Sequence, residues 1–133
     1  MENIQQLQQQ FSRFNHWEDR YRYLIQLGKK LPLIEATEWE KMPLIHGCEA
    51  EVRFLAQKDA DTRSGYHFSA YSEARIINGL LYLLLSALQD LSLNEIRQFD
   101  LTALLQQCGI AQRLSQTRLN GLKNIETHLR HLD

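Results

Sequence analysis

The chain has 133 residues, which is the size of one domain and long enough to bury a substantial core. Hydrophobic residues make up 44% and charged residues 23%, and the net charge of −1 offers no field of one sign to attract nucleic acid or an anionic membrane. The N-terminus has no secretory signal pattern, and the longest apolar stretch, Leu80–Leu85, is far shorter than the roughly 20 residues of a membrane helix.

Two helices are predicted at the start of the chain. Residues 1–14 place four apolar side chains at helical spacing, namely Ile4, Leu7, Phe11 and Phe14. Asn15 followed three positions later by Glu18 predicts a capping box for a second helix, which Gly28 ends. That helix carries an aromatic stripe whose helical spacing indicates core packing rather than a binding face: Trp17, Tyr21 and Tyr23.

Short strands are predicted after a connector between Pro32 and Pro43, which contains a possible helical turn at Ala36–Lys41. Leu44-Ile45 reads as a short strand, Gly47 as a tight turn that presents Cys48, and residues 52–57 as an alternating second strand. After a loop at 58–65, residues 66–71 alternate as a third strand. Connections this short require antiparallel pairing.

The rest of the chain is predicted to be helical. Ser72 is the expected cap of a long helix from Glu73 to about Gln89, which is apolar on more than one face and is therefore expected at the centre of the core. Three further helices are expected to begin at a Ser92–Glu95 capping box, at Asp100 and at Ser115, and the last runs from Gln116 to Leu132. The pattern predicts an α+β fold with helices covering a small antiparallel sheet of about three strands.

The two cysteines, Cys48 and Cys108, lie sixty positions apart and lack the spacing of a zinc site or a disulfide framework, which suits a reducing cytoplasm. Cys108 precedes Gly109 at an expected helix end and is interpreted as a partly buried structural thiol. Taken alone, Cys48 is also more typical of an inert buried residue than of a reactive one. A glycine turn between two strands is nevertheless a place where reactive groups are held.

Three sequence blocks carry a resemblance to a known family: Leu44-Ile45-His46-Gly47-Cys48-Glu49-Ala50-Glu51-Val52, Tyr71-Ser72-Glu73-Ala74-Arg75-Ile76-Ile77-Asn78-Gly79-Leu80-Leu81 and Leu114-Ser115-Gln116-Thr117-Arg118-Leu119-Asn120-Gly121-Leu122. In these blocks, their order and its overall length, the chain resembles the SufE/CsdE family of sulfur-acceptor proteins, which work with cysteine desulfurases in iron–sulfur cluster assembly. The resemblance implies a single SufE/IscU-like domain over residues 1–133.

The resemblance also implies roles for individual residues. Cys48 would be the persulfide acceptor and Arg118 a candidate stabiliser of its thiolate or persulfide, with a set of loop and supporting residues around them: His46, Gly47, Glu49 and Glu73. No cofactor and no metal are implied, because pyridoxal phosphate belongs to the desulfurase. The implied partners are a SufS- or CsdA-like cysteine desulfurase and a downstream sulfur acceptor or iron–sulfur scaffold, and the protein would be an accessory of the relay and not itself an enzyme.

Two other functions remain open from the residues. The chain departs from the usual family residues at Ala50, Arg53 and Glu73. The altered flanks Ala50 and Arg53 motivate a regulator that binds a desulfurase without carrying sulfur. His46, two positions before Cys48, invites a thiol enzyme with a nucleophile–base pair. No third member of such a site is evident, and Glu49 and Glu51 would raise the thiol pKa, which favours a carrier activated by its partner.

Overall fold

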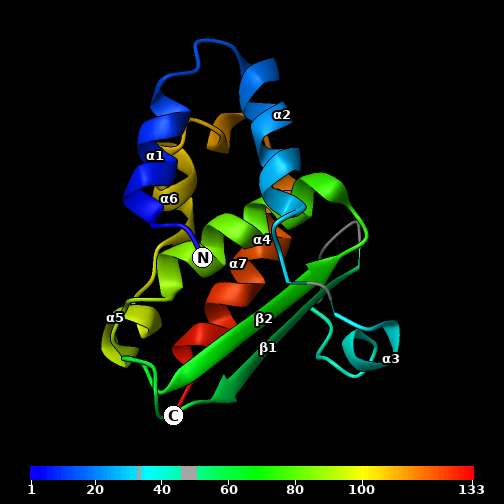
Figure 1. Cartoon of the computed structure of the whole chain (residues 1–133), viewed down its shortest axis with the longest axis vertical. Coiled ribbons are helices and arrows are strands. Elements are labelled where there is room, and N and C mark those ends of the chain that lie inside the picture. Colours follow the sequence, from blue (N-terminus) through cyan, green and yellow to red (C-terminus); the bar gives the residue numbers. More distant parts are fainter. Residues whose placement is uncertain (33, 46–50) are drawn as a thin grey trace.

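The computed structural model describes residues 1–32, 34–45 and 51–133. Most of the helices lie to one side of a two-stranded hairpin, with α3 set apart beside β1 (Figure 1). The predicted α+β class is therefore confirmed. The elements are α1 (Ile4–Ser12), α2 (Trp17–Gly28), α3 (Ala36–Trp39), β1 (Val52–Lys58), β2 (Tyr66–Ser72), α4 (Arg75–Leu88), α5 (Leu93–Arg97), α6 (Leu101–Gln107), the 3-10 helix η1 (Ala111–Arg113) and α7 (Gln116–Arg130).

The sheet consists of β1 and β2, paired antiparallel from Val52↔Ser72 to Lys58↔Tyr66. The segment expected as a further strand contributes one bridge, between Leu44 and Arg53, within the described residues. The Ile45 N–H donates to the Val52 carbonyl over 2.8 Å, and the Phe54 N–H donates to the Pro43 carbonyl over 3.1 Å. Since proline has no N–H, the ladder does not continue upstream of this bridge.

The core is centred on α4, as its apolar pattern predicted. Every residue of α4 from Gly79 to Leu88 is buried. Its backbone lies very close to α2, because a Cβ on Gly79 would stand 2.2 Å from the Leu24 carbonyl oxygen and one on Gly28 would stand 2.8 Å from the Gly79 nitrogen. These two glycines let α2 and α4 pack backbone to backbone, closer than side chains would allow.

Most of the predicted helix starts are confirmed. Ser92 and Glu95 form the complete capping box of α5, the Asp100 side chain accepts from the Ala103 N–H at the start of α6, and Ser115 caps α7. The end of α6 is also as expected, with Cys108 at the C-cap and Gly109 at a φ of +71°.

Two predicted caps are wrong. His16, not Asn15, is the N-cap of α2, and the His16 side chain makes no capping hydrogen bond. The N-cap of α4 is Ala74, because Ser72 is still part of β2 and its hydroxyl is engaged there. The core-packing interpretation of the aromatic stripe holds for Trp17 and Tyr23, whereas Tyr21 is 43% exposed.

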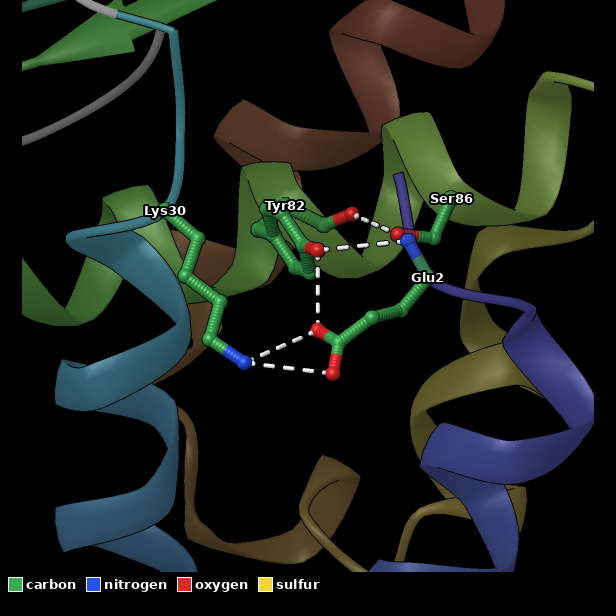
Figure 2. A network of polar contacts seen from close by, with 4 residues as sticks. All are labelled: Glu2, Lys30, Tyr82 and Ser86. Carbon is green, nitrogen blue, oxygen red and sulfur yellow. Dashed lines mark hydrogen bonds and ion pairs between the residues drawn. The ribbon is translucent and has the colours of Figure 1, made fainter.

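The N-terminal segment is tied to α4 and to the end of α2 by a polar network (Figure 2). The Tyr82 hydroxyl donates to the Glu2 carboxylate over 2.8 Å, and Lys30 Nζ contacts both oxygens of that carboxylate at 3.1 Å. Ser86 Oγ donates to the Tyr82 carbonyl one turn earlier in α4. Burial would raise the pKa of Glu2, but the hydrogen bonds from Tyr82 and Lys30 outweigh it and the pKa is lowered.

Candidate functional site

The segment that carries the predicted acceptor thiol lies between two described residues, Ile45 and Glu51. Cys48 itself, together with His46, Gly47 and Glu49, lies outside the described residues. The structure describes both flanks of this segment: the entering chain, which ends at Ile45, and the leaving chain, which begins at Glu51.

The entering chain is fixed against the start of β1. Ile45 is 2% exposed, and its N–H bonds to the Val52 carbonyl. Met42, three positions earlier, is also buried. The backbone that leads to residue 46 is thus part of the hairpin layer and is held there by burial of two apolar side chains.

The leaving chain is held by Arg53, whose guanidinium contacts both the backbone of the entering chain and the Glu51 carboxylate. Nη1 donates to the carbonyls of Glu40 and Met42, each over 2.8 Å. Nε donates to Glu51 Oε1 over 2.9 Å, and Nη2 contacts the same oxygen. The Arg53 side chain is 18% exposed and the Glu51 side chain 34%, so this ion pair is partly shielded from water.

The Arg53 guanidinium packs against the Trp39 ring, which in turn packs against Tyr71. Its carbon lies 5.5 Å from the centroid of the Trp39 ring in α3, which is within the range of a cation–π contact. The Trp39 ring in turn lies 5.2 Å from the ring of Tyr71, the residue directly opposite Arg53 in the sheet register. α3 is therefore held onto β1 and β2 through Trp39.

A second set of contacts joins the same end of the hairpin to α4. Ser72 Oγ donates to the Glu51 carbonyl over 2.7 Å and accepts from the Ala74 N–H over 3.2 Å. Asn78 of α4 accepts from the Ser72 N–H over 2.8 Å and donates to the Ser72 carbonyl over 2.7 Å. Both flanks of residues 46–50 are consequently attached to the rigid core, which is the condition for positioning a side chain precisely enough for chemistry.

Arg53, Ser72 and Asn78 together form a frame that holds the two flanks of residues 46–50. The sequence analysis did not predict Arg53 and Asn78 as parts of this frame. Asn78 did carry a signal, because an amide inside the otherwise apolar run of α4 needs a hydrogen-bond partner when it is buried. Arg53 gave no comparable signal, since its carbonyl partners lie 11 and 13 positions away and are brought near only by the fold.

Arg118 and Glu73 are described residues of the predicted site. Arg118 lies in the first turn of α7, is half-buried, and donates its backbone N–H to Ser115 Oγ over 3.2 Å. None of the ion pairs within residues 1–32, 34–45 and 51–133 involves its guanidinium. Glu73 is exposed and immediately precedes the N-cap of α4. The relation of either residue to Cys48 stays a prediction.

The second cysteine has the structural character predicted for it. Cys108 is 2% exposed, and burial raises the pKa of its thiol to about 12. At neutral pH it is a thiol and not a thiolate, and so it is a poor nucleophile.

Neither a metal cluster nor a membrane span is found in the part of the chain that the structure describes. No three His, Cys, Asp or Glu side chains there are grouped closely enough to hold a metal ion. No helix there has both the length and the apolar character needed to cross a bilayer.

Comparison with known proteins gives a consistent result over almost the whole chain. Residues 5–132 match the family described as SufE, Fe-S metabolism associated domain. An uncharacterized SufE-like protein of Haemophilus influenzae is 42% identical, over 93% of this chain and 97% of that protein. The sulfur acceptor protein CsdE of Escherichia coli is 36% identical, over 87% of this chain and 78% of its own. An uncharacterized SufE-like protein of Rhizobium etli is 31% identical, over 98% and 88% respectively.

Proposed function

This chain belongs to the SufE family, and from that membership we propose that it is a sulfur acceptor of iron–sulfur metabolism that carries sulfur on Cys48. The observation that carries the assignment to this thiol is the burial of the other cysteine. Cys108 is enclosed and its pKa is raised to about 12, which makes it unsuited to attack a persulfide. Cys48 is then the acceptor within a single domain.

The proposed transfer is a thiol–disulfide type of exchange. The Cys48 thiolate attacks the outer sulfur of a persulfide on the donor protein and forms a new S–S bond. The donor's own S–S bond breaks, and its electron pair leaves with the donor cysteine as a thiolate. Cys48 then holds the persulfide, and a second thiol repeats the step to remove the sulfur, so no external oxidant or reductant is consumed.

The charges around the segment have opposite effects on this chemistry. Glu49 and Glu51, which follow Cys48 by one and three positions, disfavour its thiolate, while Arg118 is the cation that we assign to stabilise the thiolate or the persulfide. His46, Gly47 and Glu73 are assigned supporting roles in the same segment and at the start of α4. The frame of Arg53, Ser72 and Asn78 is consistent with a thiol that is presented to a partner from a fixed base.

The donor is proposed to be a pyridoxal-phosphate-dependent cysteine desulfurase of the SufS or CsdA kind, which the acceptor stimulates by removing its sulfur. The downstream partner would be an assembly scaffold or another acceptor thiol. The protein is an accessory of this relay and not an independent enzyme. A lone acceptor thiol is suited to a reducing compartment such as the cytoplasm.

Intact-mass measurement tests the proposal directly. The protein is incubated with a cysteine desulfurase and free cysteine, and the wild type is expected to gain sulfur. Cys48→Ser should gain none, whereas Cys108→Ala, the matched control, should gain as much as the wild type. A wild type that stays unmodified with a panel of desulfurases contradicts the proposal. If Cys48→Ser still stimulates the desulfurase fully, the protein is a regulator that does not carry sulfur.

A further inference from the structure

We propose that a cavity at the turn end of the hairpin binds a small aromatic carboxylate, and that the Glu2 side chain occupies the carboxylate position of this cavity as a displaceable ligand from the chain itself. The cavity has a volume of about 760 Å³ and is lined by the N-terminal segment, the end of α2, the start of β2 and α4. This volume is within the range of small-molecule sites. Ser72, which belongs to the frame of the acceptor segment, lies about 20 Å along β2 from Tyr66 in the cavity. The inference therefore does not rest on the proposed function.

The wall of the cavity is apolar and largely aromatic. It contains the buried side chains of Tyr66, Phe68, Tyr82 and Leu85. The Tyr66 and Phe68 rings are stacked, with 6.2 Å between their centroids and 21° between their planes. The Tyr66 hydroxyl is already used as a donor to the Asp133 carbonyl over 3.0 Å, so Tyr66 offers its ring to a ligand. A wall of this kind favours a flat aromatic body.

One part of the cavity already holds a carboxylate, that of Glu2 (Figure 2). The Tyr82 hydroxyl donates to Glu2 Oε2 over 2.8 Å, and Lys30 Nζ contacts both carboxylate oxygens at 3.1 Å. Tyr82 is 3% exposed, so its hydroxyl is fixed in the wall. Burial would raise the pKa of Glu2, yet these hydrogen bonds lower it, which means that the two donors favour the charged carboxylate. A hydroxyl and an ammonium are thus arranged to bind a carboxylate.

The contact of the Glu2 side chain with Lys30 is weak enough to be exchanged. The Glu2 side chain is 39% exposed and that of Lys30 is 50% exposed, and an ion pair with this much access to water contributes little to stability. The backbone of Glu2 has its own ties to α4. Its N–H donates to the Tyr82 hydroxyl over 3.3 Å, and its carbonyl accepts from Gln89 Nε2 over 2.9 Å. The side chain can therefore turn away while the N-terminal segment stays in place.

The ligand has to combine a carboxylate with an apolar body. A carboxylate alone would replace one exposed ion pair by another and gain nothing over Glu2, which is tethered beside the site. An aromatic body that contacts the apolar wall adds the burial of its own surface, which the Glu2 side chain does not supply. The chemical class is therefore a carboxylic acid with one or two aromatic rings.

Calorimetric titration with 2-naphthoate tests this site, and 2-naphthamide serves as an uncharged compound of the same shape. Three variants are compared with the wild type. Glu2→Ala removes the competing carboxylate, Lys30→Met removes the cation, and Lys29→Met is the matched control. Lys29 is an exposed lysine that precedes Lys30 and does not line the cavity. Thermal unfolding verifies that each variant is folded.

Glu2→Ala is expected to bind 2-naphthoate about fivefold more tightly than the wild type, because a site that is occupied part of the time has a reduced apparent affinity. Its preference for 2-naphthoate over 2-naphthamide should rise as well. Lys30→Met should bind 2-naphthoate no better than 2-naphthamide, since the cation that distinguishes them is gone. Lys29→Met should bind both compounds as the wild type does.

Absence of 2-naphthoate binding in both the wild type and Glu2→Ala overturns the inference. A 2-naphthoate affinity that stays the same in Lys30→Met also overturns it, because the compound would then bind elsewhere. An affinity that does not rise in Glu2→Ala contradicts the competition by Glu2. If Lys30→Met does not fold, Glu2→Ala decides, and equal affinities for the two compounds there contradict the carboxylate site. No desulfurase is present, so each of these outcomes is distinct from a failure of sulfur transfer.

Discussion

At the scale of single residues, the two cysteines of the chain stand in different sequence contexts. Cys108 ends α6 inside the core, while Cys48 follows a glycine in a segment whose flanks are tied down by polar contacts. The sequence alone predicted the fate of Cys108, because a cysteine before a helix-ending glycine and among leucines is in a typical core position.

The buried thiol is expected to resist alkylation. With its pKa raised to about 12, Cys108 should stay unmodified by iodoacetamide in the native protein at neutral pH and react only in denaturant. Peptide mapping after short exposures with and without urea measures this. Modification of native Cys108 at the rate seen in urea would show that the thiol is not enclosed.

Glu126 is the one acidic side chain among the buried residues of the described chain, at 8% exposed. Burial raises its pKa, and Arg130 at 3.7 Å offsets this only in part. A carboxyl group whose folded pKa is raised supports folding below its unfolded pKa, and this support is lost as pH rises through the folded value. The charged form of Glu126 is therefore unfavourable at neutral pH.

Replacing this group should stabilise the protein in a pH-dependent way. Glu126→Gln is expected to raise the free energy of unfolding by about 0.5 kcal/mol at neutral pH. The gain should disappear near about pH 4, where the unfolded carboxyl is also largely protonated. Urea unfolding of both proteins at the two pH values measures the difference. A variant that is equally destabilised at both would mean that the carboxylate is satisfied by its partners.

At the scale of elements, the spacing of apolar residues was sufficient to predict the long helices, and capping residues were sufficient for the starts of α5, α6 and α7, whereas η1 was not predicted. The predictions failed where one side chain had two possible uses. Ser72 has the residue type of a helix cap, yet its hydroxyl bonds to the Glu51 carbonyl because β2 extends through it. Tertiary pairing of β2 with β1 decided between the two uses.

The contact between α2 and α4 should be sensitive to a single methyl group. Gly79→Ala places a Cβ 2.2 Å from the Leu24 carbonyl oxygen, and the helices must separate. We expect a loss of about 2 kcal/mol or more in unfolding free energy, despite the better helix propensity of alanine.

Gly65→Ala is the comparison for this prediction. Gly65 has open space around its Cβ position but a φ of +82°, so its replacement should cost only the backbone strain, about 1 kcal/mol. Thermal or urea unfolding ranks the two variants. If Gly79→Ala were as stable as the wild type, the close approach of the two helices would not be required.

At the scale of the whole molecule, the fold class followed from local patterns, because short connections permit only antiparallel strands and a helix that is apolar on more than one face is expected at the centre. The frame of the site did not follow from them. Arg53 and Asn78 act through partners that are distant in sequence or on another element, and such contacts are created only when the hairpin packs against α3 and α4. The acceptor residue itself was predicted from its motif, and its role remains to be measured.

The most direct measurement of the central claim is the location of the transferred sulfur in the wild-type protein. After incubation with a cysteine desulfurase and free cysteine, free thiols and persulfides are blocked, and the peptides are mapped by mass spectrometry under non-reducing conditions. The account predicts one extra sulfur on the peptide that contains Cys48, none on the peptide that contains Cys108, and loss of the extra sulfur when an acceptor thiol is added before blocking. Sulfur found on Cys108, or on neither cysteine with an active desulfurase present, would contradict it.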